Sequence, residues 1–149
     1  MSRNWLLLFL PALVSFSSAA HESPTCVATI SELRALLGSQ TFPLNWEETT
    51  MGDGKPLIVS ILERNGALLI EFFKTTEGLW AEVVGVVCKA GIDFEVRFNA
   101  DQLRLGPSAG WPMRLAMRNG GRFSLSTVGS DQLRIATSGW SGTFSPRAK

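Results

Sequence analysis

Two segments near the C-terminus share a pattern that could bind an anion. Residues 101–104 and 131–134 both read Asp-Gln-Leu-Arg, and each is followed within a few residues by Gly-Trp. An arginine presents a planar set of N–H donors that suits carboxylates and phosphates, and an exposed tryptophan can anchor a partner protein. The side chains that carry this hypothesis are Arg104, Arg134, Trp111 and Trp140.

More arginines lie close by in the sequence and would enlarge such a surface. They fall at polar positions of predicted strands, where side chains on neighbouring strands can line up across a sheet. Residues 91–149 carry eight basic and four acidic side chains, whereas residues 21–90 carry five basic and nine acidic ones. We therefore predict that the partner is the acidic surface of another protein, although strand faces also need solvated charges. The further arginines are Arg97, Arg114, Arg118 and Arg122.

Much of the repeat also has a structural explanation. An aspartate at the start of a turn accepts hydrogen bonds from nearby backbone amides. Leu103 and Leu133 would then point into the core, and Gly110 and Gly139 would permit backbone conformations that other residues avoid. The repeat therefore predicts one kind of hairpin corner built twice, and only its arginines and tryptophans are left to suggest binding.

Residue types that support catalysis are scarce. His21 is the only histidine, so a Ser-His-Asp or Cys-His arrangement would have to recruit a residue of the N-terminal segment. The sequence has no cluster of His, Cys, Asp or Glu with the spacing of metal ligands. Glu47, Glu48 and Asp53 could supply paired carboxylates, but adjacent strand residues point to opposite faces, and a charged loop is the simpler prediction. We expect neither an enzyme nor a bound cofactor.

The N-terminus predicts export. Residues 1–20 combine a positively charged start, an apolar run and closing small residues, which is typical of a signal peptide. Cleavage after about Ala20 would leave residues 21–149 as a single domain in the periplasm or outside the cell. No later apolar stretch is long enough to span a membrane. A nearly neutral exported chain is also a poor candidate for nucleic-acid binding.

The two cysteines, Cys26 and Cys88, fit this compartment. An even number of cysteines in an exported chain first indicates a disulfide bond. Closing a loop of about sixty residues would stabilise the fold by about 4 kcal/mol, because the unfolded chain loses conformational freedom. The bond would tie the N-terminal segment to the middle of the predicted sheet.

Local sequence patterns predict a mainly β fold. Residues 28–40 form the one helical pattern, which Thr29 or Ser31 can cap and Gly38 can end. After residue 42, apolar residues alternate with a period of two, which predicts an antiparallel meander of about eight strands with one short N-terminal helix. The meander would roll into a barrel or fold into a sandwich. The predicted strands cover residues 57–62, 68–72, 79–89, 92–98, 103–105, 113–117, 123–127 and 133–137, with 143–144 pairing at the end.

The alternation also predicts which side chains face the core. Side chains that would share one side of residues 79–89 are Trp80, Glu82, Val84, Val86 and Cys88. Side chains that would point inward from residues 92–98 are Ile92, Phe94, Val96 and Phe98. Several strands are apolar on both faces, so they need cover from the helix on one side and from a barrel interior or a partner on the other. The residues that create this demand are Ile58, Leu62, Leu69, Phe73, Val83 and Val87.

These features together predict a non-catalytic exported binding protein. Its size, export and β content are similar in character to those of immunity proteins and lysozyme inhibitors, which suggests a periplasmic protein that neutralises an envelope-acting enzyme. The first alternative is a carrier of a small lipophilic ligand, since Gly78-Leu79-Trp80 matches the Gly-x-Trp of lipocalins. A cavity lined by Leu69, Phe73, Val83 and Val87 would favour the carrier. The second alternative is a structural accessory of an envelope complex.

Overall fold

The structure is a computed structural model that describes residues 25–49, 56–74, 78–106, 111–118, 120–128 and 131–147. Strands dominate this part of the chain. In chain order the elements are β1 (Thr25–Val27), α1 (Ile30–Leu37), β2 (Asn45–Glu48), β3 (Leu57–Arg64), β4 (Ala67–Lys74), β5 (Gly78–Ala90), β6 (Asp93–Arg97), the 3₁₀ turn η2 (Ala100–Gln102), β7 (Leu103–Leu105), α2 (Trp111–Arg118), β8 (Arg122–Val128), β9 (Gln132–Thr137) and β10 (Trp140–Pro146).

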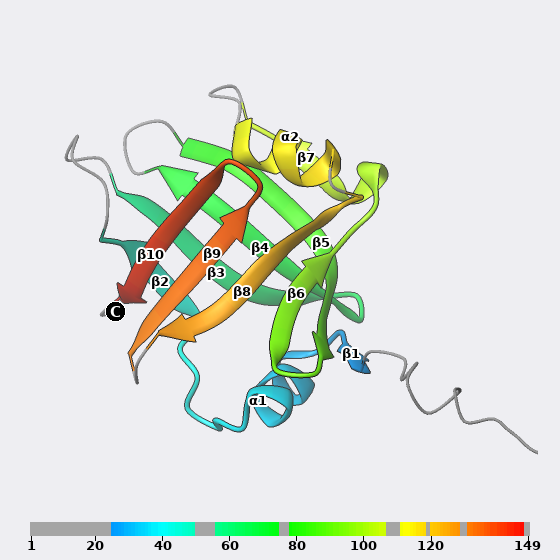
Figure 1. The fold of residues 1–149 in the computed structure, drawn as a ribbon, viewed down its shortest axis with the longest axis vertical. Helices are drawn as coiled ribbons and strands as arrows, with labels where there is room; N and C mark the ends of the chain where they lie inside the picture. Colours follow the sequence, from blue (N-terminus) through cyan, green and yellow to red (C-terminus); the bar gives the residue numbers. More distant parts are fainter. Residues whose placement is uncertain are drawn as a thin grey trace, which may run out of the picture.

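The strands close on themselves into an antiparallel barrel. Neighbouring strands pair in the order β5-β4-β3-β2-β10-β9-β8-β6, and β6 pairs again with β5. Strands β1 and β7 pair with β5 outside this ring. In Figure 1, β8, β9 and β10 form the near wall, and β3 and β4 form the far wall. The predicted mainly β, antiparallel fold is confirmed, and the ring of pairings makes it a barrel.

Helix α2 occupies a stretch that the sequence pattern predicted as a strand, residues 113–117, so that prediction is wrong. Met113 and Ala116 are fully buried about one turn apart, whereas Arg114 and Arg118 are exposed four residues apart. This is the spacing of an amphipathic helix. A short apolar run is compatible with the period of a strand and with that of a helix. Packing over the open end of the barrel favours the helix here (Figure 1).

Strand β2 forms where a charged loop was predicted around Glu47 and Glu48, so that prediction is also wrong. Trp46 of β2 is buried in the core, and its indole N–H donates to the Pro43 carbonyl oxygen at 2.8 Å. The strand pairs with both β3 and β10, and it thereby joins the two ends of the meander. The third carboxylate of that prediction, Asp53, lies outside the described residues.

Helix α1 confirms the predicted capping. The Glu32 amide donates to Thr29 Oγ1 at 3.1 Å, and the Ala28 amide donates to Glu32 Oε1 at 3.2 Å. The hydrogen bond from the Ala28 amide, followed by the one with Thr29, lowers the pKa of the Glu32 carboxyl below its ordinary value. Gly38 ends the helix in the left-handed conformation. Leu33 is fully buried, because the helix packs over the other end of the barrel (Figure 1).

Aromatic side chains fill the interior of the barrel. The Phe72 ring lies 5.9 Å from that of Phe123 and 6.1 Å from that of Trp80. The ring of Phe98 lies 6.0 Å from that of Phe123. An eight-stranded barrel is just wide enough for side chains to occupy its centre. The core is therefore a packed cluster that reaches from β4 across to β8.

A bulge in β5 changes the facing of one large side chain. The pairing of β5 with β4 skips Trp80 between Leu79 and Ala81, and Trp80 turns into the core beside Ala81. The prediction that Trp80 shares a side with Glu82 is therefore wrong. The prediction that Ile92 points inward is wrong too, because Ile92 lies in the turn between β5 and β6 and is 90% exposed.

Closure of the ring requires two glycines. Along β5, residues 78–85 pair with β4, and residues 86–90 pair with β6. At this change of partner, a Cβ on Gly85 would lie 2.4 Å from the carbonyl oxygen of Arg97. A Cβ on Gly121 would lie 2.0 Å from the carbonyl oxygen of Phe98. Only residues without a side chain allow the backbones of β5, β6 and the start of β8 to approach this closely.

The predicted disulfide between Cys26 and Cys88 is present and joins positions 62 residues apart. The two cysteines lie directly opposite each other in the pairing of β1 with β5. β1 is three residues long, and the covalent bond adds to its pairing with β5 in holding this short segment on the barrel.

Replacing Gly85 by alanine is expected to lower the free energy of unfolding by about 3 kcal/mol, because the new Cβ overlaps the Arg97 carbonyl oxygen. The matched control is Gly91→Ala, whose added Cβ meets no atom within 4 Å. There only the left-handed backbone is disfavoured, at about 1 kcal/mol. Urea unfolding measured by circular dichroism compares them, and equal losses in the two variants would contradict the steric explanation.

Reducing the Cys26–Cys88 bond is expected to lower the free energy of unfolding by about 4 kcal/mol, because the open chain regains the freedom of a long loop. The measurement compares urea unfolding midpoints with and without dithiothreitol. A double variant with serine at both positions serves as the control and should not respond to the reductant. A loss of unfolding free energy below about 1 kcal/mol would contradict the explanation that the bond stabilises the fold by restricting the unfolded chain.

Candidate functional site

Three arginines lie on the outer surface of β6, β8 and β9: Arg97, Arg122 and Arg134. We call this surface the basic face. Val96 and Phe123, which neighbour two of these arginines in the chain, are buried, so strand alternation directs the arginines outward. Arg97 lies directly opposite Arg122 in the pairing of β6 with β8, and Arg134 lies on the next strand. The barrel therefore gathers the three charges on three adjacent strands.

One carboxylate partly neutralises two of these arginines. Glu95 precedes Arg97 by two residues, so both side chains point out from β6. The Nε atom of Arg97 donates to Glu95 Oε2 at 2.8 Å, and Arg122 Nη1 lies 3.8 Å from the same oxygen. This group of two arginines and one glutamate carries a net positive charge. The longer contact leaves the N–H donors of Arg122 without a hydrogen bond to Glu95.

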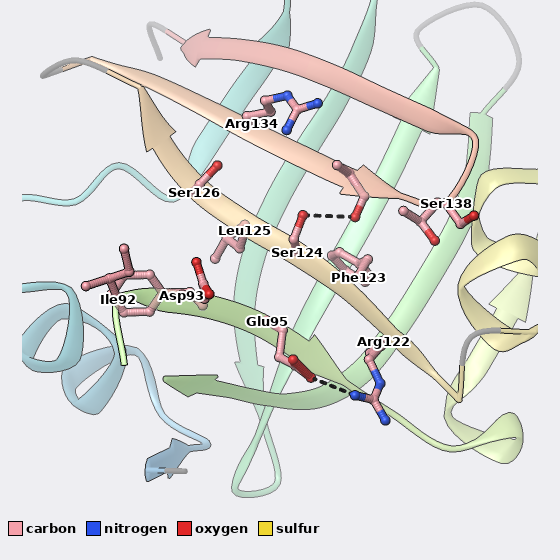
Figure 2. Close-up of a pocket in the computed structure, with 13 residues that line it drawn as sticks. Ile92, Asp93, Glu95, Arg122, Phe123, Ser124, Leu125, Ser126, Arg134 and Ser138 are labelled. Carbon is pink, nitrogen blue, oxygen red and sulfur yellow. Dashed lines mark hydrogen bonds and ion pairs between the residues drawn. The ribbon is translucent and has the colours of Figure 1, made fainter. Parts of the chain in front are cut away.

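Two hollows lie in the basic face and share Arg122. The larger has a volume of about 640 Å³ and is lined by residues of β6, β8 and β9, including Arg122 and Arg134 (Figure 2). Ser124 and Ser126 project outward there, and their small size leaves the surface low between the arginines. The smaller hollow, of about 470 Å³, lies beside Arg97 and Arg122. An extended acidic segment could follow both hollows and meet all three arginines.

Arg134 is the least compensated cation of the basic face. It is exposed, and the residues opposite it on the neighbouring strands are Ser126 and Thr143. Within the described part of the chain, no carboxylate forms an ion pair with Arg134. The acids of the same hollow, Asp93 and Glu95, lie on β6, two strands away. Its charge is therefore available to a partner.

Arg104, the counterpart of Arg134 in the repeated sequence, lies elsewhere and has a different role. It sits on β7 directly opposite Glu82 of β5 and forms an ion pair with that carboxylate. Arg64 approaches the other oxygen of Glu82 at 3.8 Å. Because Glu82 is only 6% exposed, its charge needs these partners. The structure thus separates Arg104 from the basic face.

The other predicted binding residues also lie away from the basic face. Arg114 and Arg118 are exposed on α2, over one end of the barrel. Trp140 begins β10 and packs half-buried against the core, its ring 6.3 Å from that of Trp80. It therefore helps to fill the barrel end and does not stand free in a loop. Trp111 begins α2, and its side chain is not among the described ones.

Four residues of this surface were not among the predicted binding residues: Ile92, Glu95, Ser124 and Ser126. Alternation along β6 and β8 does mark Glu95, Ser124 and Ser126 as outward-facing. Alternation does not give the register between β6 and β8, and that register places Arg97 opposite Arg122. Ile92 borders the larger hollow and adds an exposed apolar contact beside the charges.

The carboxylates considered for catalysis have structural partners. Glu47 lies 3.7 Å from Arg147, and Glu48 accepts a hydrogen bond from the Leu57 amide at 3.3 Å. Within the described residues, no three His, Cys, Asp or Glu side chains are grouped as metal ligands would be. None of the helices in the described ranges combines the length and apolar character needed to cross a membrane.

Two groups of side chains each combine two arginines with one glutamate, centred on Glu82 and on Glu95. They are expected to contribute differently to the stability of the fold. Glu82→Gln should lower the free energy of unfolding by about 2 kcal/mol, because Arg104 loses its charge-assisted hydrogen bond to the buried carboxylate. Glu95→Gln is the matched control and should change it by less than about 1 kcal/mol, since its ion pairs are exposed to solvent. Urea unfolding measures both. A larger loss for Glu95→Gln would contradict the structural role assigned to Glu82.

Comparisons of this chain with protein-family models, with curated proteins and with solved structures found no match.

Proposed function

We propose that this protein is a non-catalytic binding protein that holds an acidic surface of another protein against the basic face. In its most specific form it is a periplasmic inhibitor or immunity protein that neutralises an enzyme acting in the cell envelope. The observation that carries the proposal is the basic face itself: three outward arginines beside two hollows that share Arg122.

The arginines retain the donors that a partner carboxylate needs. Glu95 accepts a hydrogen bond from Nε of Arg97, which leaves the terminal N–H groups of Arg97 and those of Arg122 for another acceptor. Arginine pairs with carboxylates through two parallel N–H donors, and such charge-assisted bonds are stronger than neutral ones. Arg134 offers a second binding point across the larger hollow. Side chains of Asp or Glu on a partner loop fit this spacing of charges.

An apolar contact lies beside the charged ones. Ile92 is exposed at the tip of the turn between β5 and β6, at the border of the larger hollow. Protein interfaces generally combine an apolar anchor with a polar surround. Ile92 supplies the anchor, and the arginines supply orientation and charge selectivity. This combination favours a folded protein partner over a free anion.

The disulfide supports the exported location. Structural disulfides persist in oxidising compartments such as the periplasm and the extracellular space. Cys26 and Cys88 form such a bond, and residues 1–20 have the pattern of a signal peptide. An inhibitor of an envelope enzyme would work in this compartment.

The packing of the barrel favours a binding surface over an internal ligand. A carrier was expected to have a cavity lined by Leu69, Phe73, Val83 and Val87. Val83 and Val87 belong to the core cluster, whereas Leu69 and Phe73 lie on the outer face of β4, so the four do not line one space. The aromatic rings described above occupy the centre of the barrel. We therefore favour a protein partner over a lipophilic ligand.

The double substitution Arg122→Ala/Arg134→Ala is expected to weaken binding of the partner at least about tenfold, because it removes two of the three charges of the basic face. The measurement is affinity capture from an envelope extract with immobilised protein, followed by titration of the recovered protein. Wild type should retain one stoichiometric protein whose enzymatic activity falls when the complex forms.

The matched control is Arg114→Ala/Arg118→Ala, which removes the same charge from α2 and should capture the partner as wild type does. Equal losses in the two double variants would contradict the assignment to the basic face and favour the wider set of arginines. Recovery of extractable lipid with no protein would favour the carrier. A captured protein that keeps its activity in the complex would favour a structural accessory.

A further inference from the structure

The smaller hollow of the basic face differs from the larger one in the charges that line it. It has a volume of about 470 Å³ and lies where β5, β6 and β8 meet the turn η2. The larger hollow is lined by two carboxylates, Asp93 and Glu95. Among the described residues that line the smaller hollow there is no carboxylate, whereas Arg97 and Arg122 both line it. An anion with more than one charge therefore meets less repulsion in the smaller hollow.

The two arginines of the smaller hollow share one carboxylate. Arg97 and Arg122 lie directly opposite each other on antiparallel strands, an arrangement in which like charges destabilise a sheet. Glu95 Oε2 accepts a hydrogen bond from Arg97 Nε at 2.8 Å. The same oxygen lies 3.8 Å from Arg122 Nη1 (Figure 2). One negative charge thus offsets two positive ones, and a second anion beside the arginines would relieve the remaining repulsion.

Glycine at residue 120 leaves one edge of the Arg122 guanidinium uncovered. A Cβ on Gly120 would lie 3.4 Å from Nη2 and 3.7 Å from Nε of Arg122, so this edge of the guanidinium lies beside the Gly120 backbone. Gly120 itself lines the smaller hollow. Nε–H and Nη2–H are parallel donors, and with such a pair arginine binds two oxygens of one anion. The edge that Glu95 does not occupy is therefore the one that suits an oxyanion.

The turn η2 adds a further donor to the smaller hollow. Gln102 is half-buried and lines the hollow. Its Oε1 atom accepts a hydrogen bond from the Asn99 amide at 2.7 Å. The oxygen of this side chain is thereby held toward the backbone, and its NH₂ group, which only donates, is the part available to a ligand. Donors thus come from β6, from η2 and from β8.

We propose that the smaller hollow is a binding site for a phosphate group. Phosphate is tetrahedral and carries roughly two negative charges, so its oxygens can accept from Arg97, Arg122 and Gln102 together. A carboxylate offers only two oxygens in one plane and a single charge. The two sources of such a group are free phosphate and a lipid headgroup that ends in phosphate. The inference goes beyond the proposed function, because it needs no partner protein and Arg134 does not line this hollow.

Titration of the purified protein with inorganic phosphate at constant ionic strength tests the proposal, with the arginine Nε–H groups followed by NMR. Saturable shifts are expected at Arg97 and Arg122, with Arg134 unchanged. Arg122→Ala should raise the phosphate dissociation constant at least about tenfold, because it removes the guanidinium edge beside Gly120. Glu95→Gln should lower that constant about threefold, because the carboxylate of the chain no longer competes for the two arginines.

The matched control is Arg134→Ala, which removes the same charge from the next strand and should bind phosphate as wild type does. A further variant, Gln102→Glu, keeps the oxygen that accepts from the Asn99 amide and replaces the NH₂ group by a charged oxygen. It should weaken phosphate binding in the same direction as Arg122→Ala. Near-ultraviolet circular dichroism checks that each variant keeps the wild-type fold.

Co-sedimentation with phosphatidylcholine vesicles, with and without phosphatidic acid, separates the two sources of phosphate. Saturable shifts with inorganic phosphate support a soluble ligand. Binding to the phosphatidic acid vesicles alone, lost in Arg122→Ala and kept in Arg134→Ala, supports a lipid headgroup at the same site. The proposal is overturned if neither probe binds, or if Arg134→Ala loses as much affinity as Arg122→Ala. Capture of a partner protein is measured separately, so either proposal can fail without the other.

Discussion

The contact on which the rest of the structure depends is the close approach of three backbone segments where β5 leaves β4 and joins β6. Glycine at residues 85 and 121 lets the carbonyl oxygens of Arg97 and Phe98 come nearer than any side chain would allow. Without this approach the sheet would stay open and its interior apolar side chains would meet water. With it, β6 lies between β5 and β8, and Arg97 comes to lie opposite Arg122.

Burial explains why similar charge clusters have different roles. Two arginines share one glutamate on each wall of the barrel, but Glu82 is buried whereas Glu95 is partly exposed. A buried carboxylate must be paired to be tolerated, so Arg104 serves the fold first. An exposed ion pair contributes little to stability, so Arg97 and Arg122 remain available to a partner. Solvent access thus separates the structural role of Arg104 from the proposed binding role of Arg97 and Arg122.

The sequence predicted the features that depend on local patterns. Strand alternation and the cap of α1 are encoded within a few residues, and the disulfide follows from two cysteines in a chain whose first residues have the pattern of a signal peptide. The sequence pattern did not predict helix α2 or the bulge at Trp80. Both depend on packing between distant parts of the chain, because α2 covers one end of the barrel and the bulge turns Trp80 into the core. Two Asp-Gln-Leu-Arg segments likewise look alike, yet only one arginine meets a buried glutamate. The register between strands that are distant in the sequence decides which residue lies opposite each arginine, and local sequence patterns do not encode that register.

The measurement that tests the central claim most directly is a titration of the protein with poly-glutamate, followed through the NMR signals of the arginine Nε–H groups. The probe carries the carboxylates that the basic face is proposed to bind. The predicted result is a set of saturable shifts at Arg97, Arg122 and Arg134, with Arg104 unchanged. Equal shifts at Arg114 and Arg118 would contradict the claim, because the negative charge would then be recognised wherever arginine is exposed.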